Sequence, residues 1–231
     1  MRATISILTY SAITQVRKCL ASVLAFSTDY DLILTANGSP EAAKMFQAHA
    51  LGRPNVRVVV NEENLGFMEP NRRALAMTET PLFVMLNDDT IVCSDWLDKL
   101  RAPFTLYPKA ALSGPRSRFC RLAPNMVGVR GHPPEYLEGS CLMCRTDLMK
   151  EHGLFSPELQ FAYGEDSDLS LRMRQLGYTI HQTPFEVYHE GNATSRHVSA
   201  AFQHFHANHT FLRAKWASYL QTQDRKFPAE R

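Results

Sequence analysis

The sequence has no apolar run long enough to cross a membrane. None of its runs reaches the roughly 18–20 residues that a membrane-spanning helix requires. The N-terminal residues, from Met1 to Thr4, lead directly into an amphipathic pattern without the features of a cleavable signal. We therefore expect a soluble, cytoplasmic protein.

A strong excess of charge of one sign is also missing. The formal net charge is only +2 over 231 residues. Domains that bind nucleic acid usually carry a pronounced basic stripe, so we expect no nucleic-acid partner. Small molecules that carry phosphate groups are compatible with this weak charge.

Cysteine is scarce, and its odd count of five argues against a disulfide framework. Cys141 and Cys144 have the spacing of a zinc or redox pair, but a second pair of this kind is lacking. They also fall in a predicted strand, where residues three apart face opposite sides of the sheet. We therefore expect structural thiols at both positions.

Alternating strand and helix patterns are what the sequence does contain. Short apolar runs at residues 4–8, 32–34, 56–60 and 82–86 predict strands, and a predicted helix follows each of them. Ser39 and Pro40 have the order of a helix cap and a first helical residue. Repeated units of this kind predict an α/β fold, with a doubly wound, mostly parallel sheet flanked by helices.

Polar residues follow several of these strands, at the edge where ligands bind in such sheets. These residues are Thr9 and Tyr10, Asn37, and the run Asn87-Asp88-Asp89. Turn statistics alone also explain Asp and Asn after a strand. The convergence of three clusters on one edge favours a ligand site.

The pattern loosens in the middle of the chain and then returns. We expect Ser94 to cap a helix over 96–107 and residues 115–134 to form a mobile or ligand-ordered loop. A strand over 139–144 should follow, and then a short helix that Thr146 caps and Gly153 ends. Residues 1–197 form the predicted main domain, and residues 198–231 form an amphipathic helical extension of the same domain.

Three acids crowd the predicted start of one helix: Glu165, Asp166 and Asp168. Helix capping and the helix dipole favour acids there. Like charges repel, however, so capping does not explain why three of them share a turn. His189 follows about two dozen residues later, and the combination of acids with a histidine indicates a metal-assisted transferase.

Several ordered motifs together resemble the inverting glycosyltransferases of family 2, which have the GT-A fold. The resemblance extends over about residues 4–195 and favours a branch of rhamnosyl- and other hexosyltransferases that build bacterial surface polysaccharides. The motifs that carry it are Asn64-Leu-Gly-Phe67 with Asn71, Leu86-Asn-Asp-Asp-Thr90, Glu138-Gly-Ser-Cys-Leu-Met-Cys-Arg145, His152-Gly-Leu-Phe155, residues 161–178, and His189-Glu-Gly191.

This resemblance implies a role for each motif residue. Asp89 and His189 would bind a divalent cation, Mn²⁺ or Mg²⁺, which neutralises the leaving diphosphate. Asp88 would face the ribose, and Asn87 would face the donor sugar or a metal-bound water. Asp166 would be the catalytic base that takes the proton of the acceptor hydroxyl.

The remaining implied contacts lie around the nucleotide sugar. Glu165 and Asp168 would lie near the acceptor or support the site from behind. Leu8, Ser11 and Ala36 depart from the family pattern, so the nucleobase stays open, with UDP- or dTDP-sugars as the expected donors. The implied nucleotide-sugar contacts are Thr9, Tyr10, Asn37, Asn64, Gly66, Asn71, Gly139 and Ser140.

The expected function is metal-dependent transfer of a hexose to a hydroxyl of a glycan or lipid-linked acceptor. A degenerate fold that only binds nucleotide sugars or serves as a scaffold is the alternative, which Ala36 suggests. A sugar nucleotidyltransferase is less favoured, because the sequence lacks an N-terminal Gly-rich phosphate loop. The C-terminal helix could mediate peripheral membrane contact or a homodimer.

Overall fold

A computed structural model describes residues 1–115, 117–118, 136–185, 187–190 and 199–226, with side chains of the last helix described over 204–219. The predicted loop at 115–134 lies almost wholly outside these residues. The predicted domain boundary at 197 and Gly191 of the last motif also lie outside them.

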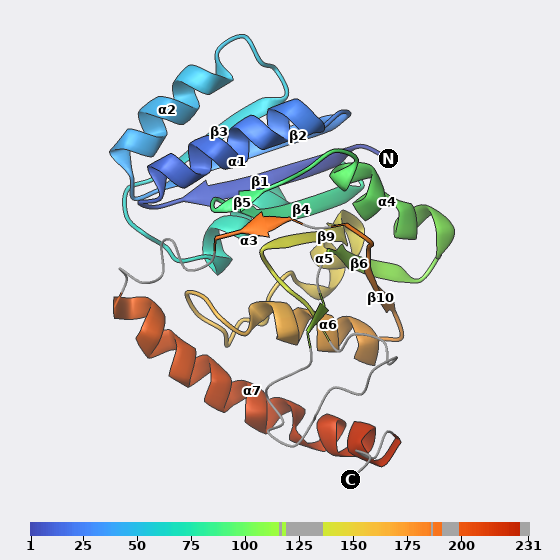
Figure 1. Cartoon of the computed structure of the whole chain (residues 1–231). Coiled ribbons are helices and arrows are strands. Elements are labelled where there is room, and N and C mark those ends of the chain that lie inside the picture. Colours follow the sequence, from blue (N-terminus) through green and yellow to red (C-terminus); the bar gives the residue numbers. More distant parts are fainter. Residues whose placement is uncertain (116, 119–135, 186, 191–198, 227–231) are drawn as a thin grey trace.

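The first half of the chain consists of the predicted βα units (Figure 1). Strands β1, β2, β3 and β4 are parallel, in the spatial order β4-β1-β2-β3. The elements are β1 (Ala3–Thr9), α1 (Ile13–Phe26), β2 (Tyr30–Asn37), α2 (Pro40–Ala50), β3 (Val56–Asn61), α3 (Met68–Ala76) and β4 (Leu82–Asn87).

The second half extends the sheet on the other side of β4. The seven-stranded order is β10-β6-β9-β4-β1-β2-β3, and β9 alone among these described strands runs antiparallel to its neighbours. The predicted mostly parallel sheet is therefore confirmed. The elements are β5 (Thr90–Ile91), α4 (Trp96–Leu106), β6 (Ala110–Gly114), β7 (Ser117–Arg118), β8 (Tyr136–Leu137), β9 (Cys141–Arg145), α5 (Thr146–His152), α6 (Glu165–Gln175), β10 (Thr179–Gln182), β11 (Tyr188–His189) and α7 (Ser199–Lys226).

Two of the three predicted helix caps are wrong. Ser39 accepts a hydrogen bond from the N–H of Ala42, as predicted. For α4 the cap position is Asp95, in a left-handed conformation with φ 61°, and not Ser94. For α5 it is Arg145, so Thr146 is already the first helical residue. Gly153 ends this helix with φ 78°, as predicted.

The sheet buries a separate apolar cluster on each face, because successive strand residues point to opposite sides. One face packs against α1, α2 and α4, and the other against α3, α5, α6 and α7. Cys141 belongs to the first cluster and Cys144 to the second. The two thiols are buried and point away from each other, which confirms their predicted structural placement.

Helix α7 shares the second of these cores. Leu212 and Trp216 are buried in it, and the helix runs along the outside of α6 (Figure 1). Among the described residues, no helix is long and apolar enough to cross a membrane.

Candidate active site

The ends of four adjacent parallel strands define one edge of the sheet (Figure 1). Each of these strands ends in a polar residue that is buried or half-buried. Ligands of doubly wound sheets bind at this edge. The residues are Thr9 in β1, Asn37 in β2, Asn61 in β3 and Asn87 in β4.

Asn37 holds the loop that follows β3. Its amide nitrogen donates to the Asn64 Oδ1 and to the carbonyl of Gly66, both at 2.9 Å. Its Oδ1 accepts from Asn61 Nδ2 at 3.0 Å and from the N–H of Leu65 at 3.1 Å. These four bonds use the full capacity of an asparagine side chain. Asn37 therefore shapes the loop at 61–66, and the contact to a nucleobase that the sequence predicts for it would require one of these bonds to break.

Two further predicted contact residues also have close partners within the protein. Asn71 is buried, accepts from the Ser6 hydroxyl and donates to the carbonyl of Phe67, which fixes α3 against β1. Gly66 has φ 76°, and a Cβ there would lie 2.6 Å from the carbonyl oxygen of Phe161. Only glycine fits this close approach between two loops.

The turn after β4 brings acids and a histidine together. His189 pairs with Thr90 across the short β5–β11 ladder. Its Nε2 lies 3.1 Å from the Asp89 Oδ1 and 3.5 Å from the Asn87 Nδ2. Burial raises the pKa of Asp88 to about 7; the adjacent Thr9 hydroxyl opposes this rise, and the charge of Asp89 adds to it.

The ligand types of this turn fit a divalent cation. A carboxylate oxygen and an imidazole nitrogen are both ligands that Mn²⁺ accepts. Within the described ranges, however, no group of three or more His, Cys, Asp or Glu side chains is arranged to hold a metal. Protein sites that hold Mg²⁺ through one or two carboxylates take further oxygens from phosphates and water. Asp89 offers one such carboxylate, and His189 adds an imidazole nitrogen beside it.

The two residues just before β9 connect this turn to the acidic helix. The N–H of Asn87 donates to the carbonyl of Ser140 at 3.0 Å, and the Thr90 hydroxyl lies 3.3 Å from the same oxygen. The N–H of Gly139 donates to the Asp166 Oδ2 at 3.1 Å. Asp166 is thereby held beside the Asn87–Asp89 turn, although 77 residues separate Asp166 from Asp89 in the sequence.

Asp166 is not the helix cap. The cap position is Gly164, and Asp166 lies within the first turn of α6, where its Oδ1 accepts from the N–H of Ser167 at 2.7 Å. Burial raises the pKa of Asp166, while the N–H groups of Ser167 and Gly139 oppose the rise. Burial and then the charge of Asp166 raise the pKa of Glu165 to about 8. Raised values make carboxylates stronger bases.

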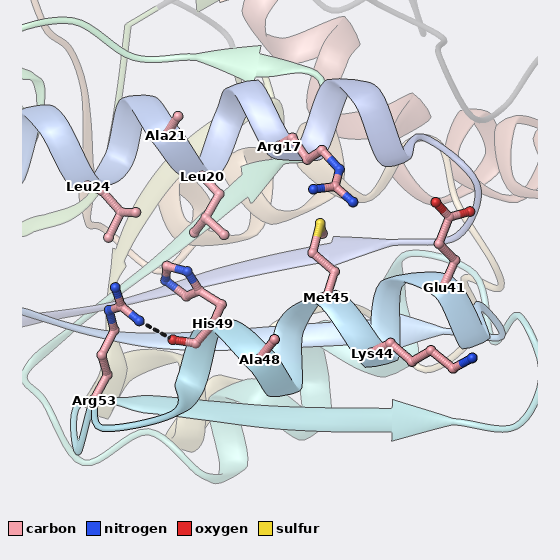
Figure 2. A pocket seen from close by; sticks show the side chains of 10 residues that line it. All are labelled: Arg17, Leu20, Ala21, Leu24, Glu41, Lys44, Met45, Ala48, His49 and Arg53. Atoms are coloured by element: carbon pink, nitrogen blue, oxygen red, sulfur yellow. Dashed lines mark hydrogen bonds between the residues drawn. The ribbon is translucent and has the colours of Figure 1, made fainter.

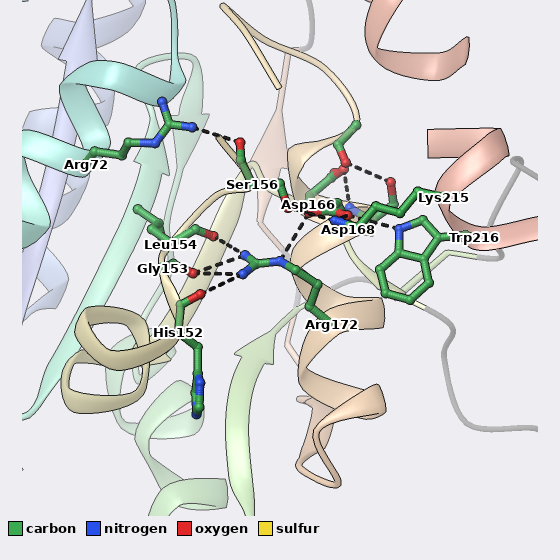
Figure 3. Close-up of polar contacts among 12 residues, drawn as sticks. Arg72, His152, Gly153, Leu154, Ser156, Asp166, Asp168, Arg172, Lys215 and Trp216 are labelled. Atoms are coloured by element: carbon green, nitrogen blue, oxygen red, sulfur yellow. Dashed lines mark hydrogen bonds and ion pairs between the residues drawn. The ribbon is translucent and has the colours of Figure 1, made fainter. Parts of the chain in front are cut away.

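Asp168 points the other way, into the contact between α6 and α7 (Figure 3). Its side chain is fully buried and accepts four hydrogen bonds. Its carboxylate is thus occupied by the protein itself. The four donors are Ser156 Oγ (2.6 Å), Arg172 Nε (3.1 Å), Lys215 Nζ (2.7 Å) and Trp216 Nε1 (2.9 Å).

Glu138 also lies at the candidate site, although the sequence motif that contains it predicts no role for it. Its Oε1 lies 4.0 Å from the Nδ1 of His189, and its charge contributes to the raised pKa of Asp166. Glu138 therefore lies between the predicted metal ligand and the predicted base. Its position directly before Gly139 and Ser140 was the available signal.

A groove elsewhere on the surface does not carry this chemistry. It has a volume of about 810 Å³ and lies between α1 and α2 (Figure 2). Leu20 and Met45 contribute to its apolar part, and Arg17 and Lys44 are among its cations. None of the predicted site residues lines it, and Glu41 is its only acid. The candidate active site is therefore the sheet edge.

The sheet order and the acid-bearing turn after β4 define the GT-A class of glycosyltransferase folds. Comparison with protein families agrees: the model described as glycosyl transferase family 2 matches residues 4–138. The chain belongs to that family.

Solved structures show the same fold at low sequence identity. GalNAc-T7 with UDP, GalNAc and Mn²⁺ is 16% identical, with a TM-score of 0.70 over 82% of this chain and 44% of that chain. The mannosyltransferase PcManGT of Pyrobaculum calidifontis, in complex with GDP-Man and Mn²⁺, is 14% identical, with a TM-score of 0.64 over 79% of this chain and 55% of that one. S. aureus TarS 1–349 is 14% identical, with a TM-score of 0.63 over 100% of this chain and 76% of that one.

One curated relative also matches. The uncharacterized protein y4gI of Sinorhizobium fredii is 25% identical in an alignment 224 residues long that covers 83% of this chain. The chain spans 24% of the length of that relative.

Proposed function

We propose that this protein transfers a hexose from a nucleotide-diphosphate sugar to a hydroxyl of a glycan or lipid-linked acceptor, with inversion and with a divalent cation. The observation that carries the proposal is the connected edge of the sheet. Asp166, Gly139, Ser140 and the Asn87–Asp89 turn are joined by hydrogen bonds, and His189 contacts the same turn. A base and a set of metal ligands thus lie side by side.

Asp89 and His189 would hold the cation, and Mn²⁺ or Mg²⁺ would neutralise the diphosphate as it leaves. Their 3.1 Å contact and their ligand types support this assignment. The Mn²⁺ present with nucleotides or nucleotide sugars in the GalNAc-T7 and PcManGT structures supports it as well.

The nucleotide would lie along the ends of β1, β2 and β3. Thr9, Tyr10 and the loop of Asn64 and Gly66 would contact it, with Asn37 and Asn71 holding that loop in place. Asp88 would face the ribose, while Asn87, Gly139 and Ser140 would lie nearest the donor sugar. UDP- and dTDP-sugars are the donors that we propose.

Asp166 would accept the proton of the acceptor hydroxyl. That oxygen would attack the anomeric carbon from the face opposite the diphosphate, so the bond to the leaving oxygen breaks and the configuration inverts. The half-buried position of Asp166 and its raised pKa support the role of base. Glu165 would adjoin the acceptor side, and Asp168 would support the turn from behind.

The biological setting that we propose is the synthesis of a bacterial surface polysaccharide. A lipid-linked acceptor would bring the enzyme to the inner face of the cytoplasmic membrane, and α7 would offer a peripheral or dimer contact. These statements rest on the resemblance of the motifs to that branch of the family.

A thermal-shift titration tests the proposed function. UDP, dTDP and GDP, with their sugars, are added with and without Mn²⁺ or Mg²⁺, because a ligand that binds only the folded state raises its melting temperature. A metal-dependent shift selective for one nucleotide, followed by sugar transfer, is the expected result. Metal-independent binding without transfer or hydrolysis would instead support the degenerate module that the buried Ala36 suggests.

A further inference from the structure

The turn before Glu165 and Asp166 has a strained backbone. Phe161 and Tyr163 have φ of 65° and 76°, although neither is glycine, and Gly164 has φ of 84°. Residues with side chains rarely adopt this left-handed region and persist there only where their surroundings hold them. Glu165 and Asp166 follow at once, so the shape of this turn sets the position of both carboxylates.

Asn208 of α7 is the side chain that holds the turn. It is 3% exposed. Its Oδ1 accepts from the N–H of Gln160 at 3.2 Å, and its Nδ2 lies 2.9 Å from the carbonyls of both Gln160 and Ala162. A third carbonyl, that of Tyr163, lies 3.1 Å from the same nitrogen. One buried amide thus binds the backbone of three residues within the strained turn.

Helix α7 is fixed to the core on the C-terminal side of this contact. Leu212 packs so closely on Gly164 that a Cβ there would lie 2.5 Å from its Cδ1. One turn further, Lys215 and Trp216 donate to the buried carboxylate of Asp168 (Figure 3). The Asn208 side chain is therefore presented from a rigid element.

The far side of the same turn contacts the nucleotide-side loop. The carbonyl of Phe161 accepts from the N–H groups of Phe67 and Met68, at 2.6 and 3.1 Å. Gly66 can lie directly against Phe161 because it has no side chain, for which there would be no space. The turn is thus clamped between Asn208 and the loop of Gly66.

We propose that Asn208 is a positioning residue for the transfer reaction, which holds residues 160–164 so that the carboxylate of Asp166 faces the acceptor. The inference rests on the proposed function. Asn208 touches neither donor nor acceptor in this account; it acts through the backbone of the turn. Small displacements of a reacting group lower the rate strongly, and about 1 Å can cost about 100-fold.

Asn208→Asp tests the proposal, because it keeps the shape and the acceptor but replaces the donating amide by a carboxylate that faces three carbonyls. Asn208→Ala removes these contacts together with the bond from the Gln160 N–H, adds no charge, and serves if the first variant does not fold. Thr210→Ala is the matched control, since Thr210 is an exposed polar residue on the same helix. Each variant is assayed for melting temperature, for kcat and donor KM, and for hydrogen exchange of the amides at 160–166.

The expected result for Asn208→Asp is a kcat lower by about 10- to 100-fold with a donor KM within about threefold of wild type. Exchange at 160–166 should rise by about tenfold while the amides of β1 and β4 stay protected. Wild-type kcat and wild-type exchange at the turn would overturn the proposal, as would a uniform rise of exchange across the chain. If the wild-type protein transfers no sugar, the proposed function fails, and the exchange at the turn still decides whether Asn208 holds it.

Discussion

Replacement of Asp168 by Asn should destabilise the whole fold, although Asp168 lies only two residues from the proposed base. Its carboxylate is fully buried and accepts from two cations, Arg172 and Lys215. An amide of the same shape offers only one acceptor oxygen. Whichever way it is oriented, its NH₂ group faces two donors that lose their partner.

The size of the effect follows from the burial of the two cations. Breaking one side of a buried ion pair costs about 3–5 kcal/mol, because a charge is left without a counter-charge. Lys215 is 26% exposed and can turn toward water, so the lower limit of about 3 kcal/mol applies. At about 2–4 °C per kcal/mol for a chain of this size, the melting temperature should fall by about 6–12 °C.

Urea or thermal unfolding of wild type, Asp168→Asn, Lys215→Met and the double variant measures this cost. Lys215→Met should destabilise the wild-type protein. In the Asp168→Asn background the same substitution should lower stability less, or even raise it, because it removes the repulsion between Lys215 and Arg172. A loss of less than about 1 kcal/mol for Asp168→Asn would refute the reasoning, since that is the value of an exposed pair. Equal effects of Lys215→Met in both backgrounds would do so too.

Three further predictions concern the site itself. Burial raises the folded-state pKa of Glu165 to about 8, so protonation of Glu165 stabilises the fold at low pH, and this stabilisation is lost as the pH rises from about 4.5 through 8. The melting temperature of Glu165→Gln should therefore rise relative to that of wild type between pH 5 and pH 8. A difference in melting temperature that stays constant over this range would contradict the prediction. Gly52→Ala should lower the free energy of unfolding by about 1–2 kcal/mol, because φ is 71° there and nothing lies near the Cβ position. Gly66→Ala should lower it by about 1–3 kcal/mol more than Gly52→Ala does, because the new Cβ meets Phe161. Equal losses for the two variants would disprove the effect of the contact with Phe161. His189→Ala should lower the apparent Mn²⁺ affinity at least about tenfold, as measured by the Mn²⁺ dependence of the thermal shift with nucleotide. An unchanged Mn²⁺ dependence would rule out His189 as a ligand.

The order of strands and helices could be predicted because it depends on local patterns. Apolar runs of strand length alternate with helical periodicity as far as β4, and a parallel sheet is the arrangement that such units form. Ser39 was a predictable cap because its partner lies three residues away. Asp95 was not predictable as the cap, since a left-handed cap position has no characteristic residue type in the sequence.

The roles of single polar residues depended on contacts far away in the sequence. Asn37 ends a strand as predicted, but all the hydrogen bonds of its side-chain amide are made with residues 61–66. Asp166 and Asp168 share one helical turn, and two residues rotate a side chain by about 200° around a helix. One acid therefore faces the sheet edge and the other faces α7. The face of α6 that meets α7 was not predictable in this way. Helix α7 docks through the contacts of Asn208 and Trp216, which no local sequence pattern indicates.

The most direct test of the central claim compares wild type with Asp166→Asn in sugar transfer and in donor binding. Asparagine keeps the size of the side chain and removes the base. The account predicts a kcat lower by about 10²–10⁴-fold, with Mn²⁺-dependent donor affinity within about threefold of wild type. Turnover within about tenfold of wild type would contradict the assignment of Asp166 as the base of the transfer reaction.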